Sequence, residues 1–405
     1  MVKIGIIKET KTPVDNRVAL TPREILNIQE KYPQAQFFVQ KSDIRAYTDE
    51  EYEKCGIPVV DSLEDCDVLF GIKEAKLESL LANKHYFFFG HIAKEQPYNR
   101  PLIRKMMELG ITFSDYEYLV NEGGERLCAV GWWAGVVGAY NTMRAYGLRT
   151  QKFELEKPGL DFTLEKLISN LKEVHHLCNT SIIVTGNGKV SQGAQYILQQ
   201  MKAKELLPET FLNRASNDTL VYTVLKTKDL VKHKDGKEYD ACHFKTNGQD
   251  YVSRFNEYAY SAEILLSCHY WGPNQPIYLD EELLKDKNLS IKIVGDVTCD
   301  IKGSILSTIR PSTHAEPFYD FNPSTMDEEP AFSSENNISV MAVDTCPNAL
   351  ALDTSSYFGQ KLSEYVFPLI IKEQFDHPIL KRATILSEGK LTDKYSYLKG
   401  YAGLL

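Results

Sequence analysis

A glycine turn between an apolar run and a helix-like segment constrains the fold of this chain more than any other feature. The run Ile182-Ile183-Val184 has the length of a buried strand, and apolar residues recur at helical spacing from Val190 onward. Gly186 and Gly188 lie between the two, where glycine lets the backbone approach a pyrophosphate beside the free N–H groups of a helix start. The pattern predicts a dinucleotide-binding turn that is followed by a helix. An ordinary strand–turn–helix without a ligand is the alternative that this stretch alone leaves open.

Composition excludes several classes of protein. A length of 405 residues is typical of two domains, and the net charge of −9 argues against a nucleic-acid partner. The apolar stretch Ala129–Tyr140 is too short to span a bilayer, and the chain starts with a strand-like segment instead of a signal peptide. The eight cysteines are scattered without zinc-site spacing. We therefore expect a cytoplasmic protein with reduced thiols, no metal and no membrane or nucleic-acid partner, and we leave open whether it forms a homo-oligomer.

Strand-like and helix-like segments alternate along most of the chain. The expected strands are Lys3–Ile7, Gln36–Gln40, Val68–Ile72, Tyr86–Phe89, Ile111–Phe113, Ile182–Val184, Val221–Val224, Ile264–Ser267, Ile291–Asp296 and Ile338–Val343. This alternation predicts an α/β fold with two Rossmann-like domains, mainly parallel sheets and an interdomain cleft. We assign residues 1–130 plus 350–405 to a substrate domain and residues 131–349 to a dinucleotide-binding domain. Asn213–Val252 reads as a loop-rich insertion and Asp320–Asn337 as an exposed polar loop.

Two residues at strand ends in the first domain are candidate acid–base groups. Lys73 and His91 each follow an apolar strand, so both should point from the edge of the sheet into the cleft. An amine and an imidazole can both titrate near neutral pH when burial and neighbouring charges act on them, and Glu74 lies beside Lys73. Such a pair suits repeated proton transfers around a carbonyl carbon. The alternative is a solvated lysine and a hydrogen-bonded loop histidine without a catalytic role.

Charged residues elsewhere could bind substrate or nucleotide. Arg17 and Arg126 offer planar guanidinium groups that can grip a carboxylate, and Glu117 could tune the Lys–His pair. Asp296 and Asp344 each end a strand of the second domain, where either cofactor contact or capping would explain them.

The segment Leu206–Arg214 bears on the choice of cofactor. It follows the helix of the glycine turn and ends without the strand-terminal acid that usually binds the ribose of NAD. Arg214 could instead hold a 2′-phosphate, which favours NADP over NAD.

Taken together, these motifs resemble a known family. Ile4–Pro22, with its -KE-K-----R-ALTP pattern, looks like the start of the alanine dehydrogenase, transhydrogenase and saccharopine dehydrogenase superfamily, which shares the Lys73 and His91 motifs. The rest is similar to the lysine–2-oxoglutarate reductase domain of the bifunctional aminoadipic semialdehyde synthases. The similar stretches are Ser114–Glu117, Trp133–Val136, Val184–Ala194, Tyr251–Asn256, Tyr270-Trp271, Gly303–Ile305, Glu316–Phe318 and Gly389–Tyr395. No second, glutamate-forming saccharopine dehydrogenase domain follows, so a free-standing version is expected.

The resemblance implies a reductive condensation. L-Lysine and 2-oxoglutarate would form an imine that NAD(P)H reduces to saccharopine. It further implies that Lys73 and His91 are catalytic, tuned by Glu74 and Glu117. The other implied roles are substrate binding by Lys11, Arg17, Lys94 and Arg126, and cofactor binding by Gly186, Gly188, Lys189, Val190, Arg214, Asp296 and Asp344. Two alternatives stay open, which are an alanine dehydrogenase-like or other amino-acid or opine dehydrogenase, and a nucleotide-binding protein without catalysis.

Overall fold

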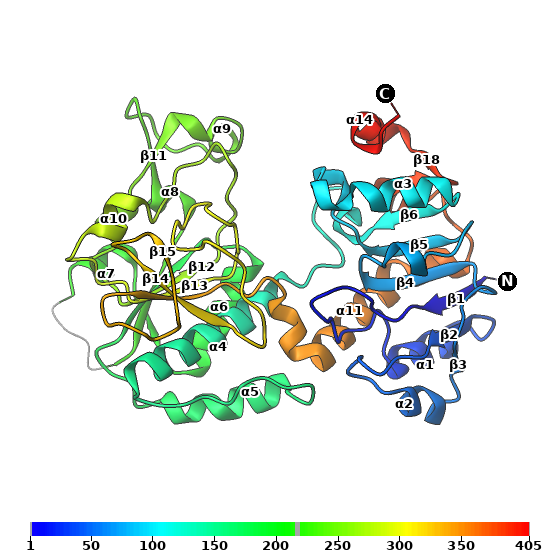
Figure 1. Ribbon diagram of the computed structural model, residues 1–405, viewed down its shortest axis with the longest axis horizontal. Helices are drawn as coiled ribbons and strands as arrows, with labels where there is room; N and C mark the ends of the chain where they lie inside the picture. The colour runs from blue at the N-terminus through cyan, green and yellow to red at the C-terminus, as the bar shows by residue number, and fades with distance from the viewer. Residues whose placement is uncertain (1, 215–218, 405) are drawn as a thin grey trace. The chain divides into compact units, whose positions relative to one another are not determined.

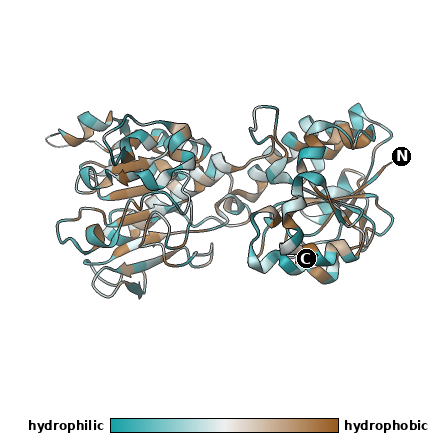
Figure 2. Cartoon of the chain, turned by 90° about the horizontal axis from the view of Figure 1, so that it is seen from above, coloured by the Kyte–Doolittle hydropathy of each residue, from teal (hydrophilic) through white to brown (hydrophobic). Residues whose placement is uncertain are grey.

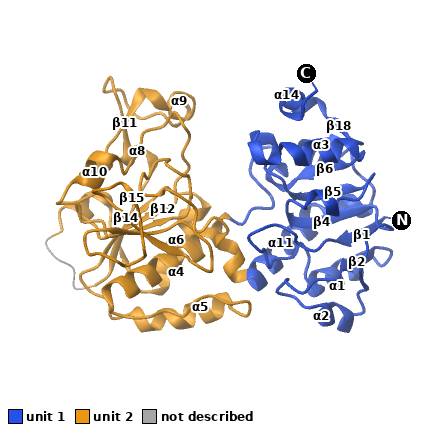
Figure 3. Ribbon diagram, in the orientation of Figure 1, with its two compact units in different colours: residues 1–130, 351–405 blue, residues 131–350 orange. Residues whose placement is uncertain are grey.

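The chain folds into two compact units, which are described separately. The computed structural model describes residues 2–214 and 219–404. One unit comprises residues 1–130 and 351–405, and the other comprises residues 131–350 (Figure 3). Figure 2 shows hydrophobic residues concentrated in the strands of each unit. Within the described ranges, no helix is both long enough and apolar enough to cross a membrane.

The first unit is built on a mainly parallel sheet. Among the described residues the strand order is β18-β17-β6-β5-β4-β1-β2-β3 (Figure 1). The parallel strands are β1 (Lys3–Ile6), β2 (Gln36–Gln40), β3 (Val59–Val60), β4 (Val68–Lys73), β5 (His85–Phe89) and β6 (Thr112–Asp115). From the C-terminal segment, β17 (Thr384–Ser387) and β18 (Lys390–Leu391) extend the sheet in the antiparallel sense. The sheet therefore brings the carboxyl ends of β1, β4, β5 and β6 to one edge.

Helices cover this sheet. They are α1 (Pro22–Lys31), α2 (Asp49–Lys54), α3 (Arg100–Glu108), α11 (Ala351–Tyr365), α12 (Phe367–Ile371), α13 (Pro378–Ala383) and α14 (Lys399–Ala402). The start of α1 follows from the sequence, because the Thr21 side chain accepts the N–H of Glu24 and Pro22 occupies the first helical turn. The central strands β4 and β5 are almost wholly apolar, as expected for strands covered on both faces.

The second unit has its own mainly parallel sheet. Its order among the described residues is β15-β14-β16-β13-β12-β7-β9-β8. The parallel strands are β7 (Ser181–Thr185), β8 (Lys204–Glu205), β9 (Val221–Leu225), β12 (Ile264–Ser267), β13 (Ile293–Asp296) and β16 (Ile338–Met341). The helices of the unit are α4 (Gly131–Thr150), α5 (Leu164–Asn170), α6 (Lys189–Gln200), α7 (Pro208–Leu212), α8 (Thr227–Leu230), α9 (Ala241–Thr246) and α10 (Glu281–Lys285). The expected α/β class with two mainly parallel sheets is confirmed.

The expectation of an exposed loop over Asp320–Asn337 is met only in part, because several residues are exposed but the segment also contains strands and a buried carboxylate. The segment includes most of β14 (Phe318–Asn322), which pairs antiparallel with β16, and β15 (Asp327–Glu329). Asp320 is fully buried because its carboxylate accepts hydrogen bonds from the Ser339 hydroxyl at 2.6 Å and the Ser333 N–H at 3.0 Å. A buried carboxylate in a strand is rare, and its partners are remote in sequence. The polar composition of the segment therefore predicted the wrong environment for Asp320, although not for its exposed residues.

Helix α6 packs very closely against α4. A Cβ atom added to Gly135 would lie 1.8 Å from the carbonyl oxygen of Val190, and one added to Gly193 would lie 1.9 Å from that of Trp132. The two helix backbones therefore touch, and any larger residue at either glycine would separate them. This contact fixes where the first turn of α6 lies.

Candidate active site

Three of the predicted residues of the first unit lie at one edge of its sheet. Lys73 ends β4, His91 follows β5 directly before η2 (Ile92–Lys94), and Glu117 lies in η4 (Tyr116–Tyr118) after β6. Because these parallel strands are neighbours, their carboxyl ends meet at the same edge. The arrangement follows from strand order, which the sequence pattern alone does not reveal.

Three basic side chains lie close to the Glu117 carboxylate. Its Oε1 accepts hydrogen bonds from Lys94 Nζ at 2.8 Å and from an Arg126 guanidinium nitrogen at 3.2 Å. Its Oε2 lies 3.7 Å from His91 Nδ1. Burial acts to raise the pKa of Glu117, but the interactions with His91 and Lys94 outweigh it and lower the pKa to about 2. Glu117 is therefore a fixed negative charge at neutral pH.

Asp115 joins the turns that carry His91 and Glu117. Its carboxylate accepts the N–H of Gly90 at 3.1 Å and the N–H of Glu117 at 2.9 Å. His91 itself has a φ of 51°, a left-handed conformation that is uncommon outside glycine. It occurs here in the turn that Asp115 stabilises by accepting the N–H of Gly90. Burial, and to a smaller extent the charge of Glu117, raise the pKa of Asp115 to about 6. Asp115 lies in the Ser114–Glu117 stretch, but its role depends on the β5–β6 pairing and was missed.

A second buried network supports Lys73. Glu9 accepts the N–H of Ile72 at 2.6 Å and the N–H of Lys73 at 2.9 Å. Burial and the neighbouring Asp15 raise the pKa of Glu9 to about 8. Sequence reasoning missed Glu9, although it lies in the same -KE-K- pattern as Lys11.

Two predicted substrate-binding residues of this unit already hold protein carboxylates. The Arg17 guanidinium donates to both oxygens of Asp15, at 2.9 and 2.6 Å, and only 5% of Arg17 is exposed. Burial opposes ionisation of Asp15, but Arg17 outweighs it and lowers the Asp15 pKa. Lys11 Nζ lies 2.7 Å from Glu74 Oε1. Arg17 and Lys11 stay predicted substrate contacts, and a substrate carboxylate would have to share or replace these partners.

The glycine turn of the second unit has the geometry that a nucleotide needs. Gly186 has a φ of +82°, and a Cβ there would lie 2.8 Å from the Cα of His269. A Cβ on Gly188 would meet nothing within 4 Å, so the backbone is uncovered on that side. Lys189, the first residue of α6, is exposed, and Val190 is half-buried. These features fit the pyrophosphate of a dinucleotide, which would receive the N–H groups of the turn and of α6.

His269 packs against this turn, and both nitrogens of its ring lie within hydrogen-bonding distance of a hydroxyl group. Its Nδ1 is 2.7 Å from the Thr185 hydroxyl and its Nε2 is 2.8 Å from the Ser304 hydroxyl. Burial lowers the pKa of His269 to about 3, so the ring is neutral, and it links Thr185 of β7 to Ser304, which follows β13. A lone histidine after a strand gives no indication of this contact in the sequence.

Asp296 and Asp344 have different environments. Asp296 is 1% exposed, and its oxygens accept the hydroxyls of Thr298 at 2.6 Å and Thr308 at 2.7 Å. Burial raises the pKa of Asp296. This geometry favours the capping alternative, and the assignment of Asp296 as a cofactor-binding residue stays a prediction. Asp344 follows β16 and is exposed, so its role as a ribose contact stays a prediction.

The assignment of Arg214 to a 2′-phosphate does not fit the sheet. Arg214 precedes β9, stacks on the Phe211 ring and donates to the carbonyl of Ser261, which precedes β12. Both strands run away from Arg214, so the side chain lies at the amino edge, opposite the glycine turn. The neighbour of β7 is β9, and the residues after its end at Leu225 take the place we had given to Leu206–Arg214.

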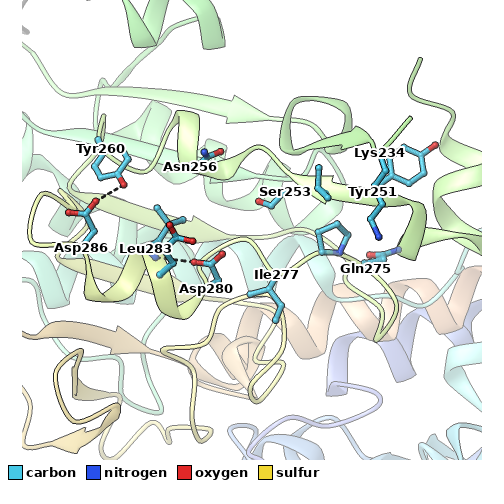
Figure 4. Close-up of a pocket in the computed structure, with 13 residues that line it drawn as sticks. Lys234, Tyr251, Ser253, Asn256, Tyr260, Gln275, Ile277, Asp280, Leu283 and Asp286 are labelled. Atoms are coloured by element: carbon cyan, nitrogen blue, oxygen red, sulfur yellow. Dashed lines mark hydrogen bonds between the residues drawn. The ribbon is translucent and has the colours of Figure 1, made fainter. Parts of the chain in front are cut away.

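The second unit also has a hollow of about 680 Å³ (Figure 4). Lys234, Tyr251 and Gln275 line it at one end, and Tyr260 donates a hydrogen bond to Asp286 at 2.8 Å at the other. The residues around it include none of those predicted from the sequence to bind substrate or cofactor.

Comparisons with known proteins show what this chain is similar to. Residues 5–137 match the alanine dehydrogenase/PNT N-terminal domain family. The alpha-aminoadipic semialdehyde synthase of Arabidopsis thaliana is 31% identical over 98% of this chain, which spans only 41% of that relative. A saccharopine dehydrogenase [NAD(+), L-lysine-forming] of Yarrowia lipolytica is 24% identical, with 89% of this chain and 90% of that protein covered. A solved L-alanine dehydrogenase has a TM-score of 0.66 at 15% identity, covers 99% of both chains and shares the fold.

Proposed function

We propose that this chain is an oxidoreductase acting on amino-acid CH–NH groups. The match of residues 5–137 to the alanine dehydrogenase/PNT N-terminal domain family supports the proposal, as does the similarity of the chain to an alpha-aminoadipic semialdehyde synthase and a saccharopine dehydrogenase. Its reaction interconverts L-lysine, 2-oxoglutarate and NAD(P)H with saccharopine and NAD(P)⁺. The observation that carries the proposal is the ionised Glu117 carboxylate facing His91, Lys94 and Arg126 at the sheet edge where β4 delivers Lys73.

The proposed reaction requires several proton transfers. The lysine ε-amine must lose a proton to attack the 2-oxo carbon, the resulting carbinolamine must gain one at oxygen to release water, and the imine forms. Bound NAD(P)H would supply the hydride that adds to the imine carbon, and the product is a secondary amine. Lys73 and His91 are the groups we assign to these transfers, each of which contributes about 10²–10⁴ in rate in typical enzymes.

The basic groups around Glu117 suit a dicarboxylic substrate. Lys94 and Arg126 are half-exposed, at 46% and 49% of their side chains, so both can turn part of their donors toward solvent and substrate. Arg126 is held by a backbone bridge to Val120. A guanidinium and an ammonium at this position match the carboxylates of 2-oxoglutarate.

We assign NADPH as the preferred reductant. The end of β9 is followed by Lys226 and Lys228, which are both exposed, and not by an acid that could bind the ribose hydroxyls. The nearby Asp229 is occupied, since its carboxylate accepts the Lys226 N–H at 2.9 Å. Cations at this position favour a 2′-phosphate.

The test is a substrate comparison with purified protein. We expect oxidation of NADPH only when 2-oxoglutarate and L-lysine are both present, with saccharopine as the product identified by mass spectrometry. Ornithine in place of lysine measures selectivity for the amine. Oxidation with pyruvate and ammonia alone would instead favour an alanine dehydrogenase, and NADPH binding without turnover would favour a non-catalytic nucleotide-binding protein.

A further inference from the structure

A small β-ribbon inserted between β9 and β12 carries two histidines and an aspartate close together. The ribbon pairs β10 (Val231–His233) with β11 (Tyr251–Ser253), and α9 and η6 (Gly248–Asp250) lie in the connection (Figure 1). His233 ends β10, His243 lies in α9 and Asp250 ends η6. One ligand atom from each lies within 4.8 Å of the other two. This group takes no part in the proposed reaction.

Main-chain hydrogen bonds fix the three residues independently. His233 lies opposite Tyr251 in the ribbon, and the Lys234 N–H donates to the carbonyl of Asp250 at 2.9 Å. The Asp240 side chain accepts the N–H of His243 at 2.7 Å and so sets the start of α9. The side chains therefore converge on a framework that does not depend on their mutual contacts.

The contacts of His243 place both of its ring nitrogens. Nδ1 lies 3.3 Å from the Tyr251 hydroxyl oxygen, which also lies 3.4 Å from the carbonyl oxygen of Asp240. Nε2 and Asp250 Oδ2 lie 3.6 Å apart. Their separation is close to the roughly 3.3 Å between neighbouring ligands around a tetrahedral Zn²⁺ ion.

The carboxylate of Asp235 lies close to the His233 ring. His233 is 6% exposed, and its ring centroid lies 5.6 Å from that of His243. Its Nδ1 accepts the Asp235 N–H at 3.1 Å and lies 3.9 Å from Asp235 Oδ2. The chain that follows β10 therefore holds the His233 ring in place without help from a cation.

We propose that His233, His243 and Asp250 form a binding site for a divalent transition-metal ion, with Zn²⁺ as the best match. Two imidazoles and one carboxylate are ligands that Zn²⁺ prefers, and a water molecule completes the tetrahedron. Bound metal would tie the connection 234–249 to the ribbon. The sequence-based expectation of no metal rested on cysteine spacing and did not consider this set. The proposal is independent of the proposed function.

The test is metal titration of the full-length protein after removal of metals with a chelator. With Co²⁺ as probe we expect one ion per chain, with visible ligand-field bands and without thiolate charge transfer. Zn²⁺ should displace it and slow amide hydrogen exchange in residues 231–253. His243→Ala and Asp250→Asn, both at half-buried positions, should each weaken binding by at least about tenfold.

Two control variants address binding elsewhere. His176→Ala removes an exposed histidine of the same unit, and Cys242→Ser removes the exposed thiol beside His243. Both should bind Co²⁺ as the wild type does. The proposal is overturned if His243→Ala and Asp250→Asn keep wild-type affinity, if the wild type binds no Co²⁺ or Zn²⁺ at millimolar concentration, or if Cys242→Ser abolishes binding. Either of the first two results would leave an ordinary His243–Asp250 ion pair.

Discussion

Glu9 accepts the backbone N–H of Lys73 through Oε2 at 2.9 Å, while its other oxygen accepts the N–H of Ile72. Glu9 follows β1 and Lys73 ends β4, so one buried carboxyl group joins the carboxyl ends of two neighbouring strands. The backbone of the candidate catalytic lysine is therefore held from a different strand than its own.

This contact predicts a pH-dependent stability. Burial raises the pKa of Glu9 from 4.5 to about 8, so between these values the folded protein holds a proton that the unfolded chain has released. The contribution of Glu9 to the free energy of unfolding is thus fully present below pH 4.5 and is lost as pH rises through 8. Glu9→Gln cannot ionise. We expect its melting temperature, relative to that of the wild type, to be higher at about pH 9 than at about pH 5. Thermal unfolding at both values checks this, and a constant difference contradicts it.

Lys73→Met and His91→Gln test the acid–base assignment. Each should lower turnover by roughly 10²–10⁴, because each removes one group that exchanges protons with the substrate. Nucleotide affinity, measured by fluorescence titration with NADPH, should stay at the wild-type value, because the glycine turn belongs to a different unit. Wild-type turnover in both variants would show that the two residues have structural roles only.

Glu117→Gln removes the negative charge that faces His91, Lys94 and Arg126. The Glu117 pKa is lowered from 4.5 to about 2, so its contribution to stability is present above pH 4.5 and is lost as pH falls toward 2. We expect the variant to be less stable than the wild type at neutral pH, with a gap that closes on acidification. Urea unfolding across this range measures the gap. Glu122→Gln, at an exposed glutamate nearby, should show no such trend.

The sequence predicted those parts of the fold that depend on local patterns. Apolar runs such as Gln36–Gln40 and Ile264–Ser267 coincide with β2 and β12, since buried parallel strands are recognisable by composition. It failed at β14, where a buried carboxylate depends on the distant Ser339. It also failed for Arg214, because the two-residue strand β8 was not anticipated and the true neighbour of β7 comes later in the chain.

Some residues of the candidate site could likewise be predicted from the sequence, and others could not. Lys73 and His91 could be found because each follows an apolar strand. Asp115 and His269 could not, since each acts through partners on neighbouring strands whose order the sequence does not state. Arg17 was predicted to hold a substrate carboxylate, and the carboxylate that it holds in this structure is that of Asp15, two residues away.

The choice of cofactor can be tested at the end of β9. Lys226→Ala and Lys228→Ala should each raise the KM for NADPH roughly tenfold, because a charge-assisted hydrogen bond to the 2′-phosphate is lost, and leave the KM for NADH unchanged. Arg214→Ala is the matched control, because that guanidinium stacks on Phe211 at the other edge of the sheet. A loss of NADPH preference in Arg214→Ala alone would show that Arg214 binds the 2′-phosphate.

Substitution by alanine should have different effects on stability at Gly186 and at Gly188. At Gly186 alanine would have to adopt a φ of +82° and place its Cβ 2.8 Å from His269, so Gly186→Ala should lower the free energy of unfolding by at least ~1–2 kcal/mol. At Gly188 the added Cβ meets no protein atom, so Gly188→Ala should melt at the wild-type temperature. It should nevertheless weaken NADPH binding, since the methyl group enters the space beside the turn that the pyrophosphate needs. Calorimetry and NADPH titration of both variants separate the two effects, and a Gly188→Ala protein with wild-type affinity would place the nucleotide elsewhere.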